Sequence, residues 1–502
     1  MSPRAAVLVA APLASGVLLW LASPSVGLWA LGWVALVPAG ALALARPETR
    51  AGRAALPLAF GIALELELVP ALPFGLADDQ WGEPPVPILV AGSPVLVVAL
   101  VLVPAVTLLL YALRFPQPLP LGRPRSARVA LASVAVAATA WTALDVVRTD
   151  LDPGGFWGPL FLSQAGAPTA RLAALGGPWL VTFALAASGL ALAALLVARP
   201  RRVALAPLAL AAALAVAPLL VDTEPGGDTV RVAAVQPGYD TAEFDLRVNR
   251  YLRSVSRDLE RASLDLLGDL APLTREAAAD GAEIVLWPEA TLWVDPHENG
   301  SVGAALAGLA EETGALIVAP YFLRSESAGA VVAALPDGTL APARRKQRPM
   351  WYLGEQAADA PAGPLEAGEP ALGPLLGVDT QAPGPALRLT DAGAELLLSS
   401  THDWEALAVR QRALARLFAV ALGAPLVRAD WRHGSAVVAA DGSLAADAGL
   451  EKRRTALVGE IRVRDGATPY ARIGDAFGWA CLAAALALFL AAPFLRRRAS
   501  AG

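Results

Sequence analysis

The stretch AEIVLWPEA, residues 282–290, is a short apolar run that ends abruptly in a proline and a carboxylate. Residues 284–287 are β-branched, aliphatic and aromatic without a break, which is typical of a strand buried on both faces. Pro288 ends the strand ladder because it has no N–H group to donate. We therefore expect Glu289 to stand at the end of a buried strand, where enzymes built on a sheet often keep their chemistry. A solvated loop carboxylate is the alternative that this stretch alone leaves open.

The composition of the chain indicates a membrane protein. Of its 502 residues, 56% are hydrophobic and only 17% are charged, and long uncharged runs favour membrane-spanning helices. The formal net charge of −5 is small for this length, so nucleic acid is not an expected partner. Cys481 is the one cysteine, which excludes an intramolecular disulfide and a zinc site built from several cysteines. We expect no cofactor and no metal.

Eight apolar segments come near the length of about 20 residues that a helix needs to cross a bilayer. They cover residues 5–23, 26–44, 56–76, 87–110, 129–147, 172–197, 203–221 and 477–495. The first is longer than the apolar core of about 7 to 15 residues in a signal peptide, so we expect a retained span. Glu65 and Glu67 lie in the third segment, but their spacing places them on different helix faces.

Arginine placement predicts the orientation of these spans. Arginines cluster after spans two, four, six and eight, whereas the opposite loops are poor in basic residues. The positive-inside rule then places both termini in the cytoplasm and the segment between the last two spans outside. The clusters are Arg46, Arg50 and Arg53; Arg114, Arg123, Arg125 and Arg128; Arg199, Arg201 and Arg202; and residues 496–498.

The external segment, residues 226–468, is long enough to fold as a domain with its own core. Strand-like and helix-like patterns alternate along it, so we expect an α/β sandwich rather than more membrane helices. Strands are expected at residues 230–235, 284–287, 315–320, 331–335, 395–399, 425–428 and 435–440, with a further strand leading into 344–346. Helices are expected within residues 244–279 and at 410–422, and a hairpin turn at Asp441-Gly442.

Several motifs carry a resemblance to a known family. Trp287-Pro288-Glu289 after a buried strand, Lys346 further along and then Gly354-Glu355 resemble the nitrilase (carbon-nitrogen hydrolase) superfamily. The external placement of this domain between seven spans and one resembles the apolipoprotein N-acyltransferase branch, whose members move an acyl chain from a phospholipid to the N-terminal cysteine of a lipoprotein. The other matching residues are Trp141, Asp145, Arg148, residues 155–157, Gln164, residues 172–177, Val235-Gln236 and, most specifically, residues 468–475.

The resemblance implies an architecture and a location. The expected fold is an α-helical transmembrane bundle of about eight spans with an external nitrilase-type αββα sandwich. Residues 1–225 would form a seven-span bundle, residues 226–468 the nitrilase-like domain, and residues 469–502 the last helix with its basic cytoplasmic tail. The resemblance also implies a multi-pass protein of the bacterial inner membrane, with the domain in the periplasm and with phospholipid and a lipoprotein N-terminus as partners.

The family chemistry assigns roles to individual residues. In this family a glutamate takes the proton of a cysteine thiol, the thiolate attacks the phospholipid acyl ester, and a lysine stabilises the oxyanion. Glu289 matches the general base, Lys346 the oxyanion lysine and Glu355 an assisting glutamate. A solvated or phosphate-facing lysine is the alternative for Lys346. Trp287 is expected to contribute to substrate binding.

The nucleophile position departs from the family pattern. Residues 376–398 align with the family motif without a gap. This alignment places Gly377 at the position of the cysteine and Asp379 at the position of a further glutamate. We expect Asp379 to contribute to substrate binding. Glycine has no side chain that could attack an ester. A shifted alignment would bring Asp379 to the nucleophile position, but a carboxylate beside Glu289 would tend to share a proton with it. Cys481 lies in the last span and cannot substitute.

Two functions therefore stay open on the sequence. The first is a lipoprotein N-acyltransferase whose nucleophile is absent or supplied unusually, and the second is an inactive relative that binds phospholipid or lipoprotein. His402 and His433 are candidates for replacement acid–base groups, although no serine or threonine stands in a recognisable activating motif. A transporter with an external cap is disfavoured because the spans hold few ionisable residues.

Overall fold

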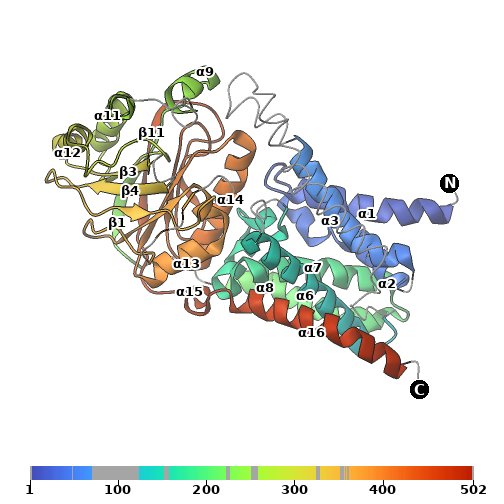
Figure 1. Cartoon of the computed structure of the whole chain (residues 1–502). Coiled ribbons are helices and arrows are strands. Elements are labelled where there is room, and N and C mark those ends of the chain that lie inside the picture. The colour runs from blue at the N-terminus through green and yellow to red at the C-terminus, as the bar shows by residue number, and fades with distance from the viewer. Residues whose placement is uncertain are drawn as a thin grey trace. The chain divides into compact units, whose positions relative to one another are not determined.

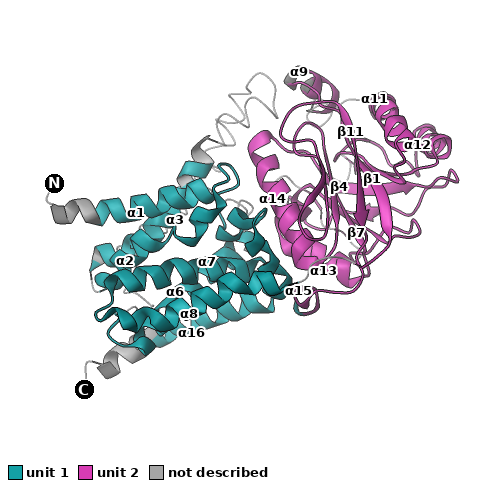
Figure 2. Ribbon diagram, turned by 180° about the vertical axis from the view of Figure 1, so that it is seen from behind, with its two compact units in different colours: residues 1–70, 86–222, 473–502 teal, residues 71–85, 223–472 magenta. Residues whose placement is uncertain are grey.

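The computed structural model of the protein describes residues 3–47, 49–70, 124–151, 158–221, 226–249, 258–323, 328–350, 355–356, 358 and 361–499. The chain divides into two compact units, which Figure 2 shows in separate colours. Unit 1 comprises residues 1–70, 86–222 and 473–502, and unit 2 comprises residues 71–85 and 223–472. Within the described ranges, unit 1 is built from helices and unit 2 combines two sheets with helices (Figure 1).

The helices of unit 1 follow the apolar runs of the sequence. Among the residues that the structure describes, three stretches are long and apolar enough to cross a membrane, namely Ala127–Thr149, Pro168–Val197 and Arg201–Leu220. Shorter apolar helices cover Leu8–Ala22, Trp29–Ala45, Ala51–Leu64 and Ala476–Ala491. The elements are α1 (Pro3–Ala22), η1 (Trp29–Trp33), α2 (Val37–Ala45), α3 (Arg50–Pro70), α6 (Ala127–Leu151), η4 (Leu160–Gln164), η5 (Pro168–Leu172), α7 (Ala173–Val197), η6 (Arg201–Ala204), α8 (Leu205–Val216), η7 (Ala217–Leu220) and α16 (Ala476–Ala499).

The second expected span is not one continuous helix. Residues 26–44 were expected to cross the bilayer, but the chain there forms the short 3-10 helix η1 and then α2, which has only 9 residues. At 1.5 Å per residue α2 is about 14 Å long, roughly half of the hydrocarbon core. Pro38 lies in the first turn of α2, where a missing N–H group is tolerated, so it marks a helix start. The fourth expected span, residues 87–110, lies outside the described residues.

Helix α7 contains a break that its glycines explain. Gly176 and Gly177 have non-helical backbone angles, with Gly177 at φ 70°, and Pro178 follows directly. Glycine adopts a positive φ without steric penalty, and proline removes one helical hydrogen bond, so the two together turn the chain inside an apolar run. The break lies inside the glycine-containing motif at residues 172–177.

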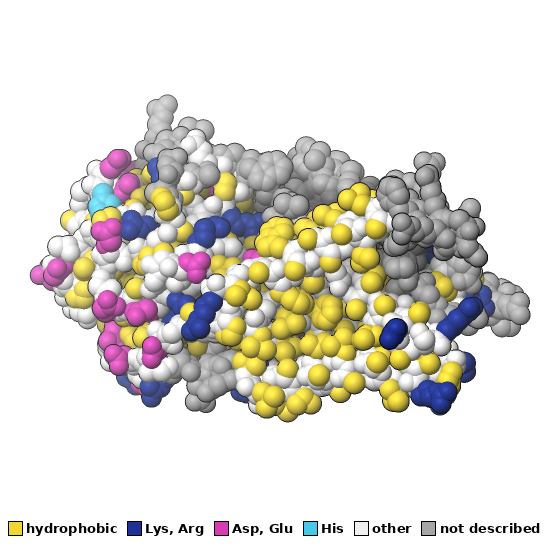
Figure 3. Space-filling view, turned by 90° about the horizontal axis from the view of Figure 1, so that it is seen from below, with side chains coloured by type: hydrophobic (Ala, Val, Ile, Leu, Met, Phe, Trp, Pro, Cys, Tyr) yellow, Lys and Arg dark blue, Asp and Glu magenta, His cyan; other side chains and the backbone are white. Residues whose placement is uncertain are grey.

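One face of unit 1 is largely apolar. Figure 3 shows hydrophobic side chains gathered over this unit in one view of the molecule. Leu205, Leu219 and Leu220 on α8 and η7, and Leu490 on α16, are each more than half exposed. Contiguous exposed apolar surface of this kind is suited to lipid rather than to water.

Unit 2 contains a six-stranded and a five-stranded sheet. The first has the order β11-β1-β2-β3-β4-β5 and the second the order β10-β9-β8-β7-β6. The strands of the first are β1 (Thr229–Gln236), β2 (Ile284–Leu286), β3 (Leu316–Leu323), β4 (Ala328–Ala334), β5 (Arg344–Arg345) and β11 (Thr455–Arg462). Those of the second are β6 (Leu372–Leu376), β7 (Leu396–Thr401), β8 (Leu426–Asp430), β9 (Ala436–Val438) and β10 (Leu444–Asp447).

Helices cover the outer faces of the two sheets (Figure 1). Helices α11 (Leu259–Ala279) and α12 (Gly300–Thr313) pack on the first sheet, and α13 (Pro383–Asp391) and α14 (Glu405–Leu422) pack on the second. The remaining short elements are α9 (Thr241–Phe244), η8 (Asp245–Asn249), η10 (Gly377–Gln381) and α15 (Pro469–Ile473). The unit is therefore a four-layered α-β-β-α sandwich.

Strand β2 is buried on both faces, as its unbroken apolar sequence predicts. Ile284 and Leu286 belong to the core cluster that joins the two sheets, whereas Val285 and Trp287 belong to the cluster under α11 and α12. The strand pairs in parallel with β1 and β3. In the second sheet β6, β7 and β8 are likewise parallel. The residues that follow β2, β6 and β7 are therefore set at the carboxyl ends of parallel strands, where α/β folds usually place their ligands.

We predict that Leu286→Ala lowers the free energy of unfolding by about 2 to 5 kcal/mol, because it leaves a cavity between the sheets. Leu286 is 1% exposed. Leu246→Ala is the control, because Leu246 is 59% exposed. Chemical unfolding of the full chain in detergent measures both variants. Equal stabilities for the two variants would contradict this description of the core.

Candidate active site

Glu289 is held by its backbone between the two sheets. Its N–H group donates to the carbonyl of Thr401 at the end of β7, at 3.3 Å. Its own carbonyl accepts a hydrogen bond of 2.7 Å from Trp431 Nε1. The next residue, Ala290, has φ 57°, which is uncommon for a residue other than glycine. The carboxylate is consequently aimed from a fixed and locally strained turn rather than from a free loop.

Lys346 and Glu355 complete a charged cluster with Glu289. Lys346 follows β5, its side chain is 3% exposed, and its Nζ lies 3.3 Å from Glu289 Oε1 and 3.1 Å from the carboxylate of Glu355. Glu355 in turn accepts a hydrogen bond of 2.8 Å from the backbone N–H of Met350. The structure thus brings together all three charged residues that the sequence analysis selected, and it places Lys346 inside the unit rather than on its surface.

Gly377 touches this cluster. It follows β6 directly and has φ 47°, so the chain turns sharply from strand to helix at this residue. A Cβ atom added there would lie 2.5 Å and 2.6 Å from the two carboxylate oxygens of Glu289. A sharp strand-to-helix turn of this kind presents the nucleophile in other hydrolase folds. A Cβ atom at these distances would require the Glu289 carboxylate to shift, so residue 377 lies directly against that carboxylate and carries no side chain.

Asp379 has a structural role in the loop around the cluster. It is 1% exposed, and its carboxylate accepts hydrogen bonds from the N–H groups of Gln347 at 3.1 Å, Arg348 at 2.6 Å and Leu376 at 3.1 Å. These bonds tie the segment after Lys346 to the end of β6. The placement differs from the expected substrate contact, because the lone pairs of the carboxylate are used by the backbone.

Trp287 also differs from the expected substrate contact. Its side chain is fully buried, and its Nε1 donates to Thr274 Oγ1 on α11 at 3.0 Å. The strand pleat explains this placement, because Trp287 shares its face with Val285 and so points toward the helices. The ring therefore packs and orients the end of β2.

Burial and neighbouring charges set the protonation of the cluster. Burial raises the pKa of Glu289 to about 7; Lys346 opposes that shift, whereas Glu355 and Asp379 add to it. Burial alone would lower the pKa of Lys346, but the carboxylates of Glu289, Glu355 and Asp379 outweigh it and raise that pKa above its ordinary value. The lysine is therefore charged at neutral pH, and Glu289 exchanges its proton near pH 7, which suits a general base.

A buried polar network that the sequence analysis missed supports the turn at Gly377. Thr380 Oγ1 donates to the Gly377 carbonyl at 2.7 Å and also bonds Gln411, whose Nε2 donates to Asp403 at 3.1 Å. Arg428 Nη2 donates to Asp403 at 2.5 Å and to Asp430 at 3.3 Å. The sequence could have indicated this network, because Arg428 and Asp430 lie in the otherwise apolar strand β8. Such charged residues are rarely buried unless they are paired.

The two histidines do not face a nucleophile in this arrangement. Burial lowers the pKa of His402 to about 4, and its ring lies against Phe244 with the centroids 4.8 Å apart. His433 Nδ1 lies 2.7 Å from the carbonyl of Leu450. The hydroxyl of Thr401 donates to Asp430 at 2.8 Å. The structure thus gives these residues packing and hydrogen-bonding roles, in place of the acid–base role considered from the sequence.

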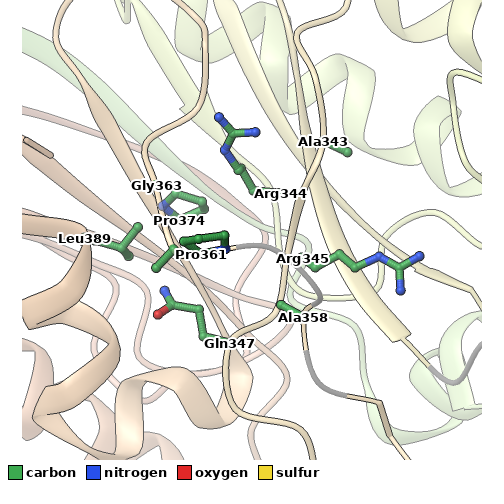
Figure 4. Close-up of a pocket in the computed structure, with 10 residues that line it drawn as sticks. Ala343, Arg344, Arg345, Gln347, Ala358, Pro361, Gly363, Pro374 and Leu389 are labelled. Carbon is green, nitrogen blue, oxygen red and sulfur yellow. The ribbon is translucent and has the colours of Figure 1, made fainter. Parts of the chain in front are cut away.

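A separate cavity of about 220 Å³ lies beside β5 (Figure 4). Figure 4 shows Arg344 and Arg345 pointing in different directions, and Arg344 is already bonded to the Pro364 carbonyl and to Glu366, each at 2.9 Å. Neither Glu289 nor Lys346 lines this cavity. Within the ranges that the structure describes, no three His, Cys, Asp or Glu side chains are grouped so that they could hold a metal ion.

Comparison with known proteins identifies the family. A family model of the apolipoprotein N-acyltransferase N-terminal domain matches residues 15–191, and a carbon-nitrogen hydrolase model matches residues 231–467. An apolipoprotein N-acyltransferase from Azotobacter vinelandii is 28% identical over 411 residues, which cover 74% of each protein. The chain belongs to the apolipoprotein N-acyltransferase family. Its unit 2 accordingly has the nitrilase-type carbon-nitrogen hydrolase fold.

Solved structures that are similar to part of the chain include a carbon-nitrogen hydrolase and an amidase. A carbon-nitrogen hydrolase from Helicobacter pylori G27 is 17% identical, with 53% of this chain and 94% of that chain covered at a TM-score of 0.37. An amidase from Nesterenkonia sp. is 18% identical, with 46% of this chain and 90% of that chain covered at a TM-score of 0.36. Each of these two structures matches only about half of the present chain.

We predict that stability depends on pH through Glu289. Since its pKa rises from an ordinary 4.5 to about 7 on folding, the stabilisation is complete below about pH 4.5 and is lost as the pH rises through 7. Glu289 should contribute about 1.4 kcal/mol to the rise in the free energy of unfolding between pH 8 and pH 6, and Glu289→Gln should reduce the rise by that amount. Burial also raises the pKa of Asp403, which adds a contribution of its own that the variant keeps. Unfolding of the full chain in detergent at both pH values measures this difference.

The matched control for this measurement is Glu312→Gln. Glu312 is about half exposed in its ion pair with Arg275, so its removal should leave the pH dependence in place. A Glu289→Gln variant that keeps the full dependence would show that another group titrates.

Proposed function

We propose that the protein is a membrane relative of apolipoprotein N-acyltransferases that binds phospholipid and a lipoprotein N-terminus but forms no acyl-cysteine intermediate. The observation that carries this proposal is the contact at Gly377. Where the family has its cysteine, this chain has no side chain, and the carboxylate of Glu289 lies within 2.6 Å of the position that a Cβ atom would take. Cys481 lies in the apolar helix α16, which belongs to unit 1, whereas Glu289 and Gly377 belong to unit 2. We therefore do not assign the role of nucleophile to Cys481.

The proposed roles of the site residues follow from their contacts. Glu289 is the general base, since its proton exchanges near pH 7. Lys346 is the group that stabilises an oxyanion, because it is buried and stays charged. Glu355 orients Lys346 through the 3.1 Å ion pair. Asp379 and Trp287 position the surrounding chain.

The proposed organisation has about eight spans. Residues 1–225 would form a seven-span bundle, residues 226–468 the external domain, and residues 469–502 the last helix and tail. In this bundle, residues 26–44 would cross as η1 followed by α2 rather than as one continuous helix. The apolar helices of unit 1 and the alternating arginine clusters support this topology, in which both termini are cytoplasmic. A location in the bacterial inner membrane with the domain in the periplasm follows from the same pattern and from the family.

A catalytically inactive binding protein is the second candidate. The missing side chain at Gly377 favours it directly, because glycine cannot form a covalent bond with an acyl group. Against it stands the cluster of Glu289, Lys346 and Glu355, which buries charges at a substantial desolvation penalty. A protein that only binds lipid would not need a base and a buried lysine at the turn.

We predict that the purified full-length protein, incubated with phospholipid carrying a labelled acyl chain, acquires no hydroxylamine-labile label. A labile adduct anywhere on residues 226–468 would overturn the proposal. Mass spectrometry of the intact protein and of its peptides locates any label.

Two substitutions at the same position provide the comparison. Gly377→Cys should acquire the labile label if residue 377 is the nucleophile position, whereas Gly377→Ala should not. Both place a Cβ atom at φ 47°, which costs about 1 to 2 kcal/mol, and both place it 2.5 Å from Glu289 Oε2. The two variants therefore share the same backbone strain and require the same shift of the Glu289 carboxylate. A label on the alanine variant would contradict the assignment of this position.

A further inference from the structure

We propose that this site transfers an acyl group in a single displacement, from a phospholipid ester directly to a primary amine that Glu289 deprotonates. This inference rests on the proposed function, because it takes the acyl donor and the amine acceptor from there. It goes further in assigning the nucleophile to the second substrate rather than to the protein. The reaction would then need both substrates bound together.

The accessibility of the charged groups supports this inference. The side chain of Glu289 is 19% exposed, compared with 3% for Lys346 and 6% for Glu355. A substrate group entering the cluster therefore meets the carboxylate of Glu289 first. Its Oε1 already accepts a hydrogen bond from Lys346, and its Oε2 lies nearest to the empty Cβ position at Gly377. That oxygen is suited to accept a proton from an incoming group.

Two hydroxyl groups near the ends of β6 and β7 already make hydrogen bonds, and a third, that of Ser399, is buried without a hydrogen-bond partner. Ser400 Oγ donates to the Trp287 carbonyl at 2.8 Å, and Thr380 Oγ1 donates to the Gly377 carbonyl at 2.7 Å. Ser399 stands on the opposite face of β7 from Ser400, because neighbouring side chains alternate along a strand. None of these hydroxyls replaces the missing thiol, so we assign the attacking atom to the substrate.

The charge of the cluster favours an amine over a neutral or anionic nucleophile. The carboxylates of Glu289 and Glu355 flank the single ammonium of Lys346, so carboxylates outnumber ammonium groups in the cluster, which attracts a substrate ammonium group. Glu355 is occupied by Lys346 and the Met350 N–H group. Glu289 is therefore the carboxylate that can take the proton from the substrate.

The proposed step balances without a further reactant. The substrate ammonium first releases one proton to solvent. The neutral amine nitrogen then attacks the ester carbonyl carbon and forms the C–N bond, while Glu289 takes one of the remaining N–H protons. The ammonium of Lys346 stabilises the negative charge on the former carbonyl oxygen. The bond from carbon to the glycerol oxygen then breaks, and Glu289 returns the proton to that oxygen. The products are an amide and a lysophospholipid in equal amounts.

The test uses the full-length protein, vesicles of phosphatidylethanolamine and phosphatidylglycerol with a labelled acyl chain, and a synthetic lipopeptide with a free α-amine. We expect N-acyl peptide and lysophospholipid to form in equal amounts, with no label on the protein at any time. The same peptide with an acetylated amine should give neither product. The rate should rise as the pH passes through about 7.

Glu289→Gln should lower the rate by about 10²- to 10⁴-fold, the usual contribution of a positioned base. Glu312→Gln, which changes an exposed carboxylate on α12, should leave the rate unchanged. Absence of N-acyl peptide and of label would overturn direct transfer while leaving the proposed function in place. Label on the protein would overturn the proposed function itself. Free fatty acid without added amine would show that water is the acceptor and would also overturn this inference.

Discussion

The contact between the carboxylate of Glu289 and Gly377 is the constraint on which the rest of the site depends. Glu289 follows a strand of one sheet and Gly377 follows a strand of the other, so the contact forms only when the two sheets pack together. Lys346 neutralises the carboxylate from a buried position, and Glu355 holds Lys346. Because buried charges are costly unless they are paired, these residues form one interdependent arrangement.

The surrounding fold keeps this contact in place through hydrogen bonds rather than through apolar packing alone. Asp379 binds three backbone N–H groups and thereby fixes the segment after Lys346 to the end of β6. Arg428 binds Asp403, which holds Gln411 beside the turn at Gly377. These hydrogen bonds position the turn at Gly377 and the segment after Lys346. The proposal of chemistry rests on Glu289 and Lys346 themselves.

Sequence reasoning predicted the parts of the structure that local pattern determines. The buried strand β2 and the position of Glu289 after it could be predicted from AEIVLWPEA, because a strand buried on both faces has a continuous apolar sequence. The roles of Trp287 and Asp379 could not be predicted, since they depend on which face of a strand or loop points inward. The break in the second apolar run, residues 26–44, was not predicted, because hydropathy alone does not show that a new helix begins near Pro38. Arg428 was missed because its partners are distant in sequence.

Crystallography of the full-length protein at high resolution is the most direct test of the central claim. We predict that the Glu289 carboxylate lies near 3.3 Å from Lys346 Nζ and against Gly377, with no other side chain between them. A Glu289 side chain turned away from Gly377, with a serine, threonine or cysteine side chain within hydrogen-bond distance of its carboxylate, would contradict the account.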